Sequence, residues 1–272
     1  MKKLGQHFLK NRSALQKVAS ALAITPDDII VEIGPGHGEL TEFIIAAQPK
    51  KLILVEKDPS LCILLEKKFR EEERIHIIEG DALKILPDII NGPLRASENF
   101  KIAGNIPYYI TGHLLRVIGE SLKKPDQCAF TIQKEVAERI CAQPPRMNRL
   151  AASVQFWAKP HIVAILKSTD FVPAPKVDSA ILSLKTVAHG PKDTESYFAI
   201  LRKLFAQPRK TIGNNITAGT KQNTSTVKEK LSLISIDPMA RPQNLTIQDI
   251  YHIAKMFAPS ENGLRHNNKS RS

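Results

Sequence analysis

Short apolar runs alternate with longer amphipathic segments along much of the chain. Apolar runs of strand length fall at residues 28–33, 51–56, 75–79, 100–103 and 128–132. Segments with a helical pattern lie between or after them, at 40–47, 59–70, 111–122 and 134–141. Strands separated by segments long enough for a helix are typical of βαβ units. The pattern therefore predicts an α/β fold built on a parallel sheet.

Two further apolar runs, at 161–167 and 178–186, are connected differently. The residues between them, 168–177, are rich in proline and show no pattern of helix length. Parallel neighbours need a long crossover, whereas antiparallel neighbours can be joined by a short loop. We therefore expect these two strands to pair antiparallel at one edge of the sheet.

The pattern changes after residue 187. Residues 187–194 read as a linker, and the strand pattern does not return beyond them. Helical patterns follow at 195–207, 209–217, 226–234 and 246–258. The sequence thus predicts an α/β domain over 1–187, a linker at 188–194, a small all-helical domain over 195–258 and a disordered basic tail over 259–272.

The chain carries a formal net charge of +12, and this charge is unevenly placed. Residues 1–20 contain five Lys or Arg and no acid, and residues 195–258 contain nine against four. The tail contains three against one, so residues 21–194 are neutral overall. A merely basic surface is the simpler explanation, but solubility gives no reason for this division, whereas a polyanion held by both ends does. The candidate RNA-binding residues are Lys2, Lys3, Arg202, Lys203, Arg209 and Lys210.

Other features of the composition narrow the class of protein. The three cysteines, Cys62, Cys128 and Cys141, form no Cys-x-x-Cys pair, so buried free thiols are expected rather than a metal site or a disulfide. No run approaches the roughly 18 apolar residues of a membrane span. The basic N-terminus lacks the apolar run of a signal peptide. A monomeric cytoplasmic protein is expected.

The candidate catalytic residues lie in the sequence Ala-Gly-Asn-Ile-Pro-Tyr at 103–108, directly after a predicted strand. Pro107 fixes its own φ and favours an extended conformation at Ile106. Asn105 Oδ1 and the Ile106 carbonyl can then point into one pocket, with the ring of Tyr108 beside it. Two acceptors and an aromatic face suit the exocyclic amine and the ring of a nucleobase.

A glycine-rich loop and two acids form the candidate cofactor site. Residues 32–38 read Glu-Ile-Gly-Pro-Gly-His-Gly, and glycines such as Gly34 and Gly36 let the backbone turn sharply and approach a ligand. Glu56 ends the second strand and suits the hydroxyls of a ribose, while Asp81 follows the third strand and suits an adenine amine. Ligands of open α/β sheets bind at this carboxyl edge.

The loop differs from a dinucleotide-binding fingerprint. The third glycine comes one residue early, and Glu39 stands in its place. Because pyrophosphate prefers a helix N-terminus free of negative charge, Glu32 and Glu39 are unfavourable neighbours for it. They are compatible with S-adenosylmethionine, which has no phosphate and carries a sulfonium and an ammonium. A nicotinamide dehydrogenase is therefore a remote alternative.

Four motifs together carry a family resemblance. They are Gly-Gln-His-Phe-Leu at 5–9, the loop at 32–38, Asn-Ile-Pro-Tyr at 105–108 and Phe-Val-Pro-Ala-Pro-Lys-Val-Asp-Ser at 171–179. With them, residues 1–258 resemble the ribosomal RNA adenine dimethyltransferases, most closely the bacterial small-subunit (16S) enzymes. The resemblance implies a class I, Rossmann-like methyltransferase domain, S-adenosylmethionine as donor, and dimethylation of two adjacent adenines near the 3′ end of the small-subunit RNA.

The resemblance also implies roles for individual residues. His7 and Leu9 would close over the cofactor, and Gly34 would line its methionine part. Asn105 would lie between donor and target and so contact the cofactor as well as the base, and Phe171 would stack on the target base opposite Tyr108. Residues 205–215 and 236–245 resemble the family's helical-domain signatures, although Pro208 and Gly213 stand where the family usually has arginines. Pro208 is expected to start a helix, and the two missing cations to weaken RNA binding.

Three alternatives within nucleic-acid biology stay open. A 23S ribosomal RNA adenine methyltransferase of the antibiotic-resistance type would share the fold, the cofactor and the Asn-x-Pro-Tyr turn. A DNA adenine methyltransferase usually has two prolines in that turn and a separate domain that reads the target. A non-catalytic RNA-binding assembly factor would use the same basic surface without chemistry.

Overall fold

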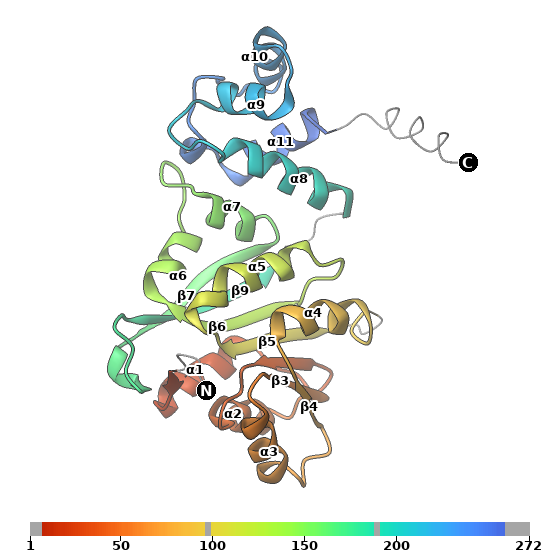
Figure 1. Cartoon of the computed structure of the whole chain (residues 1–272), viewed down its shortest axis with the longest axis vertical. Helices are drawn as coiled ribbons and strands as arrows, with labels where there is room; N and C mark the ends of the chain where they lie inside the picture. The colour runs from red at the N-terminus through yellow and green to blue at the C-terminus, as the bar shows by residue number, and fades with distance from the viewer. Residues whose placement is uncertain (1–6, 96–98, 188–190, 259–272) are drawn as a thin grey trace, which may run out of the picture. The chain divides into compact units, whose positions relative to one another are not determined.

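The computed structural model describes residues 7–95, 99–187 and 191–258 (Figure 1). The chain divides into two compact units. The sheet unit comprises Met1–Cys141 and Ser153–Ala188, and the helical unit comprises Ala142–Ala152 and His189–Ser272. Residues 142–152 thus belong with the helices, whereas the sequence analysis placed them in the α/β domain.

The sheet unit is built on a seven-stranded mixed sheet in the order β4-β3-β2-β5-β6-β9-β7. Its strands are β2 (Ile29–Ile33), β3 (Lys51–Glu56), β4 (Ile75–Glu79), β5 (Phe100–Asn105), β6 (Gln127–Gln133), β7 (Ala158–Leu166) and β9 (Ser179–Thr186). The five strands from β4 to β6 are parallel, and β9 pairs antiparallel with both β6 and β7. The α/β fold and the antiparallel pair at the edge are confirmed.

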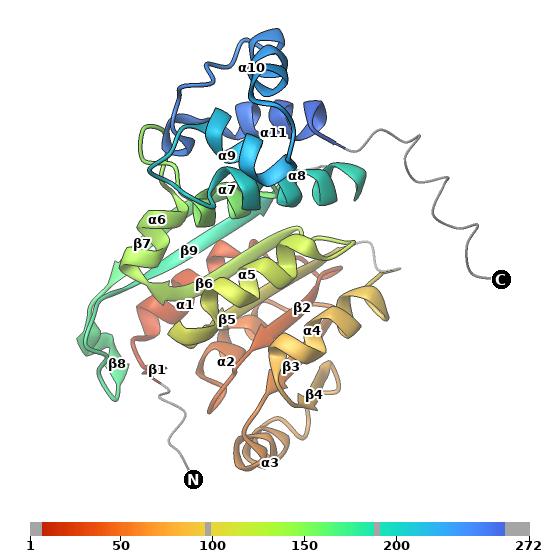
Figure 2. The ribbon, with the colours of Figure 1, turned by 45° about the horizontal axis from the view of Figure 1, so that its top comes forward.

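Helices cover both faces of this sheet (Figure 2). Helices α1 (Arg12–Ala21), α2 (Glu39–Ala46) and α3 (Pro59–Lys68) share one hydrophobic cluster with alternate strand residues such as Ile30, Leu52 and Leu54. Helices α4 (Ala82–Asn91) and α5 (Thr111–Glu120) contact each other on the other face. The short α6 (Lys134–Ile140) packs on β6, β7 and β9. Because central strands are buried on both faces, they read as continuous apolar runs.

The sheet unit also contains a second sheet, which has two strands. Strand β1 (Phe8–Leu9) pairs antiparallel with β8 (Phe171–Val172), in the register Phe8 to Val172 and Leu9 to Phe171. Beyond β1, the Lys10 amide donates to the Asp170 carbonyl at 2.9 Å. We refer to residues 7–11 as the N-terminal arm, and this pairing joins the arm to the proline-rich loop.

The helical unit contains α8 (Pro191–Leu204), α9 (Ile212–Thr220), α10 (Thr224–Leu233) and α11 (Ile247–Met256). Helix α8 therefore starts inside the segment expected to be a linker. Pro208 does not start a helix: it lies in a turn, and α9 begins only after Thr211, whose side chain caps the helix by accepting from the Asn214 amide. The Tyr197 hydroxyl donates to the Ala152 carbonyl at 2.9 Å and joins residues 142–152 to α8.

Three other expectations concern the chain as a whole. Within the described residues, no helix is long and apolar enough to cross a membrane. Cys62 and Cys128 are buried free thiols, and Cys141 is a partly buried one. The expected tail at 259–272 lies outside the described residues.

Candidate functional site

The candidate site lies where β2, β3, β4 and β5 end. The strands run parallel and in register, so the residues that follow them meet at one edge: Gly34 after β2, Glu56 at the end of β3, Asp81 after β4 and Asn105 at the end of β5. Two pockets open there, of about 460 and 480 Å³ including their mouths. Both pockets are lined by Gly34 and Pro107, so they adjoin at these two residues.

The first pocket is built around the turn after β5, and we call it the acceptor pocket. Its walls are His7, Phe8, Gly34, Asn105, Ile106, Pro107, Tyr108 and Phe171. The Ile106 amide donates to the Thr131 carbonyl at 3.0 Å, which ties the turn to β6. Gly104 is required just before the turn, because a Cβ there would lie 2.5 Å from the Ile33 carbonyl oxygen. The predicted catalytic turn thus lines a cavity, while the side chain of Ile106 is itself buried.

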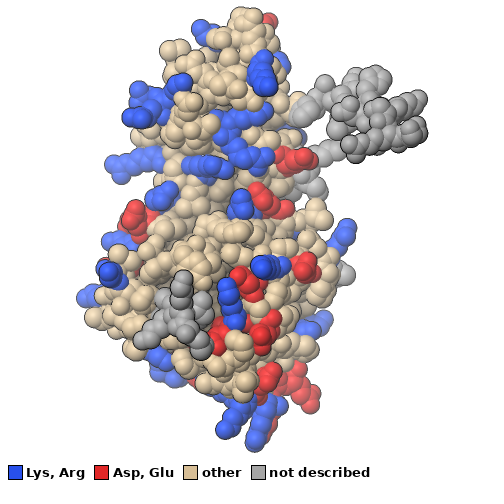
Figure 3. All heavy atoms as spheres, viewed as in Figure 1, with Lys and Arg blue, Asp and Glu red and all other residues tan. Residues whose placement is uncertain are grey.

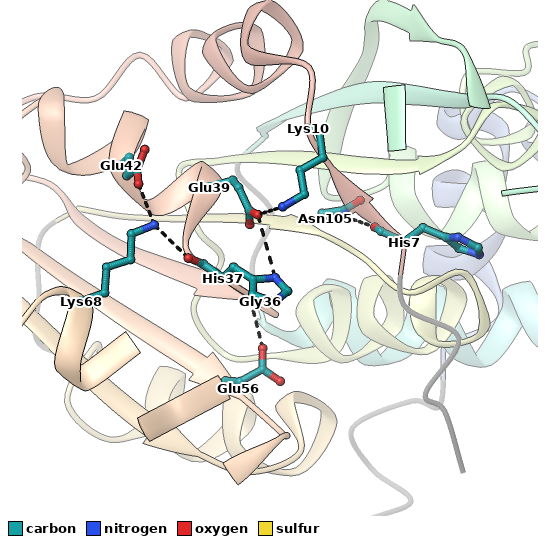
Figure 4. Close-up of polar contacts among 9 residues, drawn as sticks. All are labelled: His7, Lys10, Gly36, His37, Glu39, Glu42, Glu56, Lys68 and Asn105. Carbon is teal, nitrogen blue, oxygen red and sulfur yellow. Dashed lines mark hydrogen bonds and ion pairs between the residues drawn. The ribbon is translucent and has the colours of Figure 1, made fainter. Parts of the chain in front are cut away.

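Asn105 is held by the N-terminal arm. Its Nδ2 donates a hydrogen bond to the His7 carbonyl at 2.6 Å, a contact drawn in Figure 4. Since the amide nitrogen is committed to the arm, Oδ1 is the atom of this side chain that can accept from a ligand.

Two aromatic residues of the acceptor pocket differ in exposure. Tyr108 is half-buried, and its hydroxyl lies 2.8 Å from Ser179 Oγ, which anchors the far end of the ring. Phe171 lines the pocket but is only 3% exposed and belongs to the hydrophobic core. The sequence analysis expects a base to stack flat on Phe171. This would require the ring of Phe171 to become more exposed than it is in this structure.

The second pocket contains the two predicted cofactor acids, and we call it the donor pocket. Glu56 is buried at its base, where Oε1 accepts from the amides of Lys57 at 2.8 Å and Asp58 at 3.0 Å. Oε2 accepts from the Gly36 amide at 3.2 Å, the longest of the three bonds. A carboxylate has about four lone-pair sites, so this arrangement leaves capacity for a further donor such as a ribose hydroxyl.

Asp81 has two tasks in the same pocket. Its Oδ1 accepts from the Leu83 amide at 3.0 Å and caps α4, while Oδ2 accepts from Lys57 Nζ at 3.0 Å. The Lys57 hydrogen bond is the main cause that lowers the pKa of Asp81. Lys57 also lines the pocket, and sequence analysis missed it because no motif marks it. A ligand amine must share Oδ2 with this ammonium.

The glycine loop connects the two pockets and brings acids close together. Gly34, Gly36 and Gly38 all have positive φ, between +61° and +82°, which favours glycine at each. Glu32, at the start of the loop, is buried and accepts from Thr41 Oγ1 at 2.8 Å. Desolvation by burial raises the pKa of Glu32 to about 8, so this group is largely protonated at neutral pH.

Two lysines offset the acids that follow the loop. Lys10 of the arm pairs with Glu39, and Lys68 of α3 pairs with Glu42 at 2.6 Å and donates to the His37 carbonyl at 2.9 Å (Figure 4). The centroid of the Phe8 ring lies 4.5 Å from the centroid of the His37 ring, and the two rings meet edge to face. These contacts fix the arm across the loop.

His7 and Leu9, the two arm residues expected at the cofactor, differ from each other in position. His7 lines the acceptor pocket and not the donor pocket. Leu9 is 3% exposed, packs in the core and lines neither pocket. Leu9 can therefore act on a ligand only by holding the arm in place.

The candidate RNA-binding residues fall in two places. Arg202, Lys203, Arg209 and Lys210 belong to the helical unit, in α8 and the turn that follows it. On the face shown in Figure 3, Lys and Arg side chains are spread over that unit. Arg146 and Arg149 join the same unit through residues 142–152, a contribution that sequence alone did not predict. Lys2 and Lys3 lie outside the described residues.

Comparison with known proteins gives a consistent result. The sequence model of the ribosomal RNA adenine dimethylase family matches residues 1–259. The Ribosomal RNA small subunit methyltransferase A of Prochlorococcus marinus (strain NATL2A) is 36% identical, over 96% of this chain and 93% of the relative. Its namesake in Dehalococcoides mccartyi (strain CBDB1) is 34% identical, over 91% and 85%.

Solved structures agree on the fold. A dimethyladenosine transferase from Plasmodium falciparum superposes with a TM-score of 0.76 at 25% identity, covering 91% of this chain and 96% of that one. The 23S rRNA methyltransferase ErmE superposes with a TM-score of 0.71 at 23% identity, covering 92% and 98%. At that identity the second likeness concerns the fold alone.

The mixed sheet, the glycine loop and the two adjoining pockets define a class I methyltransferase that uses S-adenosylmethionine. The residues present fit this cofactor: Glu56 has acceptor capacity for a ribose, and a Cβ at Gly34 would meet no atom within 4 Å, so the backbone there is open to a ligand. The chain belongs to the ribosomal RNA adenine dimethylase family. Its substrate is ribosomal RNA.

Proposed function

We propose that this protein transfers methyl groups from S-adenosylmethionine to the N6 amines of two adjacent adenines near the 3′ end of 16S ribosomal RNA, in the small ribosomal subunit or its precursor. The names of the relatives support the small subunit as the substrate particle. The observation that carries the chemistry is the junction of the two pockets at Gly34 and Pro107, next to Asn105.

The residues of the acceptor pocket act on the target amine. An adenine amine is a weak nucleophile because its lone pair is delocalised into the ring. Asn105 Oδ1 and the Ile106 carbonyl each accept a hydrogen bond from one of the two N–H groups of the amine. These hydrogen bonds favour a pyramidal nitrogen whose lone pair faces the donor pocket. This is a positioning effect, and it needs no strong base. Tyr108 holds the ring by stacking.

The residues of the donor pocket hold the cofactor. Glu56 binds the ribose, Asp81 binds the adenine together with Lys57, and Gly34 leaves room for the methionine part. When bound, S-adenosylmethionine supplies an electrophilic methyl group on a sulfonium. Because attack by the neutral amine needs no strong base, the nitrogen keeps its proton until the methyl group is attached, and the proton then passes to water.

The RNA is held by the basic side chains of the helical unit and of the N-terminus, which we assign to phosphate contacts. Pro208 and Gly213 supply no charge there. A Cβ at Gly213 would lie 2.9 Å from the Pro238 carbonyl oxygen, so this position packs against backbone and has no room for an arginine.

The direct test uses ribosomal particles that lack the modification. Purified protein and labelled S-adenosylmethionine are incubated with small subunits and, separately, with large subunits, and the modified nucleosides are mapped by mass spectrometry. We expect N6,N6-dimethyladenosine at two adjacent positions near the 3′ end of 16S RNA. Label confined to 23S RNA would instead identify an enzyme of the antibiotic-resistance type.

A second experiment separates chemistry from particle binding. Glu56→Ala removes the ribose acceptor and should abolish cofactor binding. If this variant fully restores growth to a strain that lacks the gene, occupancy of immature particles is the main role and methylation is secondary. We expect restoration only by the wild-type protein.

A further inference from the structure

Asn215 is a buried polar side chain on the apolar face of α9. It is 4% exposed, and Ile212 and Ile216 of the same helix are fully buried. A buried amide costs free energy unless it is hydrogen-bonded. Its Nδ2 donates to the Gln207 carbonyl at 3.0 Å and to the Lys210 carbonyl at 3.4 Å. Both acceptors belong to the exposed turn that precedes the helix, so the amide of Asn215 serves this turn.

This turn comprises residues 207–210, and we call it the basic turn. Its four residues, Gln207, Pro208, Arg209 and Lys210, are all exposed. The Lys210 amide donates to the Gln207 carbonyl at 2.9 Å and closes the turn. Pro208 stands in the second position, where its fixed φ suits a β-turn. Asn215 binds the carbonyls of the first and last residues, so the basic turn is held from beneath at both ends.

The start of α9 is fixed by other hydrogen bonds. The Ile212 amide donates to the Ala240 carbonyl at 2.8 Å, and the Gly213 amide donates to the Pro238 carbonyl at 3.0 Å. Neither bond involves the side chain of Asn215. Loss of that side chain should therefore loosen the basic turn while the start of α9 stays in place.

We propose that Asn215 is a positioning residue for RNA binding, which together with Pro208 holds the basic turn so that Arg209 and Lys210 can contact RNA phosphates. The proposal rests on the proposed function. A turn that is already ordered loses less conformational entropy on binding than a flexible one. Pro208 supplies no charge, and its contribution to affinity is rigidity.

The test compares Asn215→Ala and Pro208→Ala, with Thr246→Ala as the matched control. Thr246 caps α11 by accepting from the Asp249 amide at 3.1 Å. Loss of this cap lowers the stability of the helical unit while the bonds of Asn215 stay in place. Binding to small subunits is measured by filter binding, and the thermal unfolding midpoint is measured for each variant.

The three variants should differ in RNA affinity. We expect Asn215→Ala to weaken binding about 5- to 10-fold, since it removes two hydrogen bonds that order the turn. Pro208→Ala should weaken binding about 2- to 5-fold, since it adds backbone freedom. Thr246→Ala should stay within about 2-fold of wild type although its unfolding midpoint falls.

Two further readouts separate positioning from general stability. The salt slope of binding should fall by up to about 2 in Asn215→Ala, one for each phosphate contact of the turn. In a protein that already carries Arg209→Ala and Lys210→Ala, the Asn215→Ala change should cost less than about 2-fold. S-adenosylhomocysteine affinity, measured by calorimetry, should change less than about 2-fold in every variant, because the donor pocket lies in the sheet unit.

Several results would overturn the proposal. They are normal RNA affinity and salt slope in Asn215→Ala, an equal loss of affinity in Thr246→Ala, and a full additional loss in the protein without Arg209 and Lys210. Wild-type affinity in the Arg209→Ala, Lys210→Ala protein would also do so. If Asn215→Ala does not fold, the exposed position Pro208 decides, and unchanged affinity in Pro208→Ala contradicts the proposal. If wild type binds small subunits but methylates neither subunit, the proposed function fails while the role of the basic turn stands.

Discussion

The side-chain amide of Asn105 has two roles. Its nitrogen binds the arm through the His7 carbonyl, and its oxygen is left for the substrate. Asn105→Ala removes the acceptor while the donor pocket, which Asn105 does not line, stays intact. We expect kcat to fall by about 10²- to 10³-fold, as when one aligned hydrogen-bonding group is lost from an active site, and cofactor affinity to change less than about 2-fold. Single-turnover methylation and calorimetry measure the two effects, and near-normal turnover would contradict the assigned role.

Glu32 predicts a pH dependence of stability. Burial raises its pKa to about 8 from the ordinary 4.5, so the folded state binds the proton more tightly than the unfolded state. This contribution to the free energy of unfolding is complete below pH about 4.5 and is lost as the pH rises through about 8. Glu32→Gln mimics the protonated form and retains a group that can hydrogen-bond to Thr41.

The variant should therefore gain stability relative to wild type as the pH rises from 5 to 8, by up to a few kcal/mol. Urea unfolding at several pH values measures the difference. Glu66→Gln, an exposed position on α3, is the control and should show almost none. A difference for Glu32→Gln that does not change with pH would show that Glu32 is ionised throughout the range.

At the scale of elements, Asp81 both starts a helix and serves the donor pocket. Asp81→Ala removes the N-cap of α4 and should cost about 1 kcal/mol of stability, besides lowering cofactor affinity. Asp81→Asn keeps the capping oxygen but loses the charge that pairs with Lys57. We expect Asp81→Asn to unfold nearly as wild type while still binding the cofactor more weakly. Equal loss of stability in both variants would contradict the capping role.

Most elements could be predicted because their local pattern agrees with their environment. The parallel strands, such as β2 and β3, are buried on both faces and read as apolar runs. Helix α4 was missed because Pro87 stands inside it, and proline usually ends a helix. Helix α1 was missed because two of its four buried residues are alanines, which give a weak apolar stripe.

The candidate site was predictable to the extent that strand ends and turns mark it. Gly34 and Asp81 follow strands, and Glu56 and Asn105 end strands, so topology brings the four residues together. The pairing of β1 with β8 was not predictable, because two-residue strands carry no periodic pattern and their partners are far apart in sequence. That pairing places His7 in the acceptor pocket and buries Phe171, so the roles of both residues depend on a contact that only the structure shows.

At the scale of the whole molecule, the division of charge predicts how RNA binding responds to salt. The basic surplus lies at the two ends of the chain, and the helical unit carries much of it, including Arg209 and Lys210 in the exposed turn before α9. Each cation that neutralises a phosphate releases a counterion, so the logarithm of the binding constant falls linearly with the logarithm of salt concentration. Removing one phosphate contact should reduce that slope by about 1.

We therefore expect Arg209→Ala and Lys210→Ala each to weaken binding to small subunits and to reduce the salt slope by about 1, and the double variant by about 2. Lys67→Ala, at an exposed position of α3 in the sheet unit, is the control for a change in net charge alone. Filter binding from 50 to 300 mM salt measures the slopes. If all variants lower affinity equally with unchanged slopes, the total charge of the protein guides association and the helical unit makes no phosphate contact of its own. If only the helical-unit variants change the slope, the basic side chains of that unit contact RNA phosphates directly, as its charge implies.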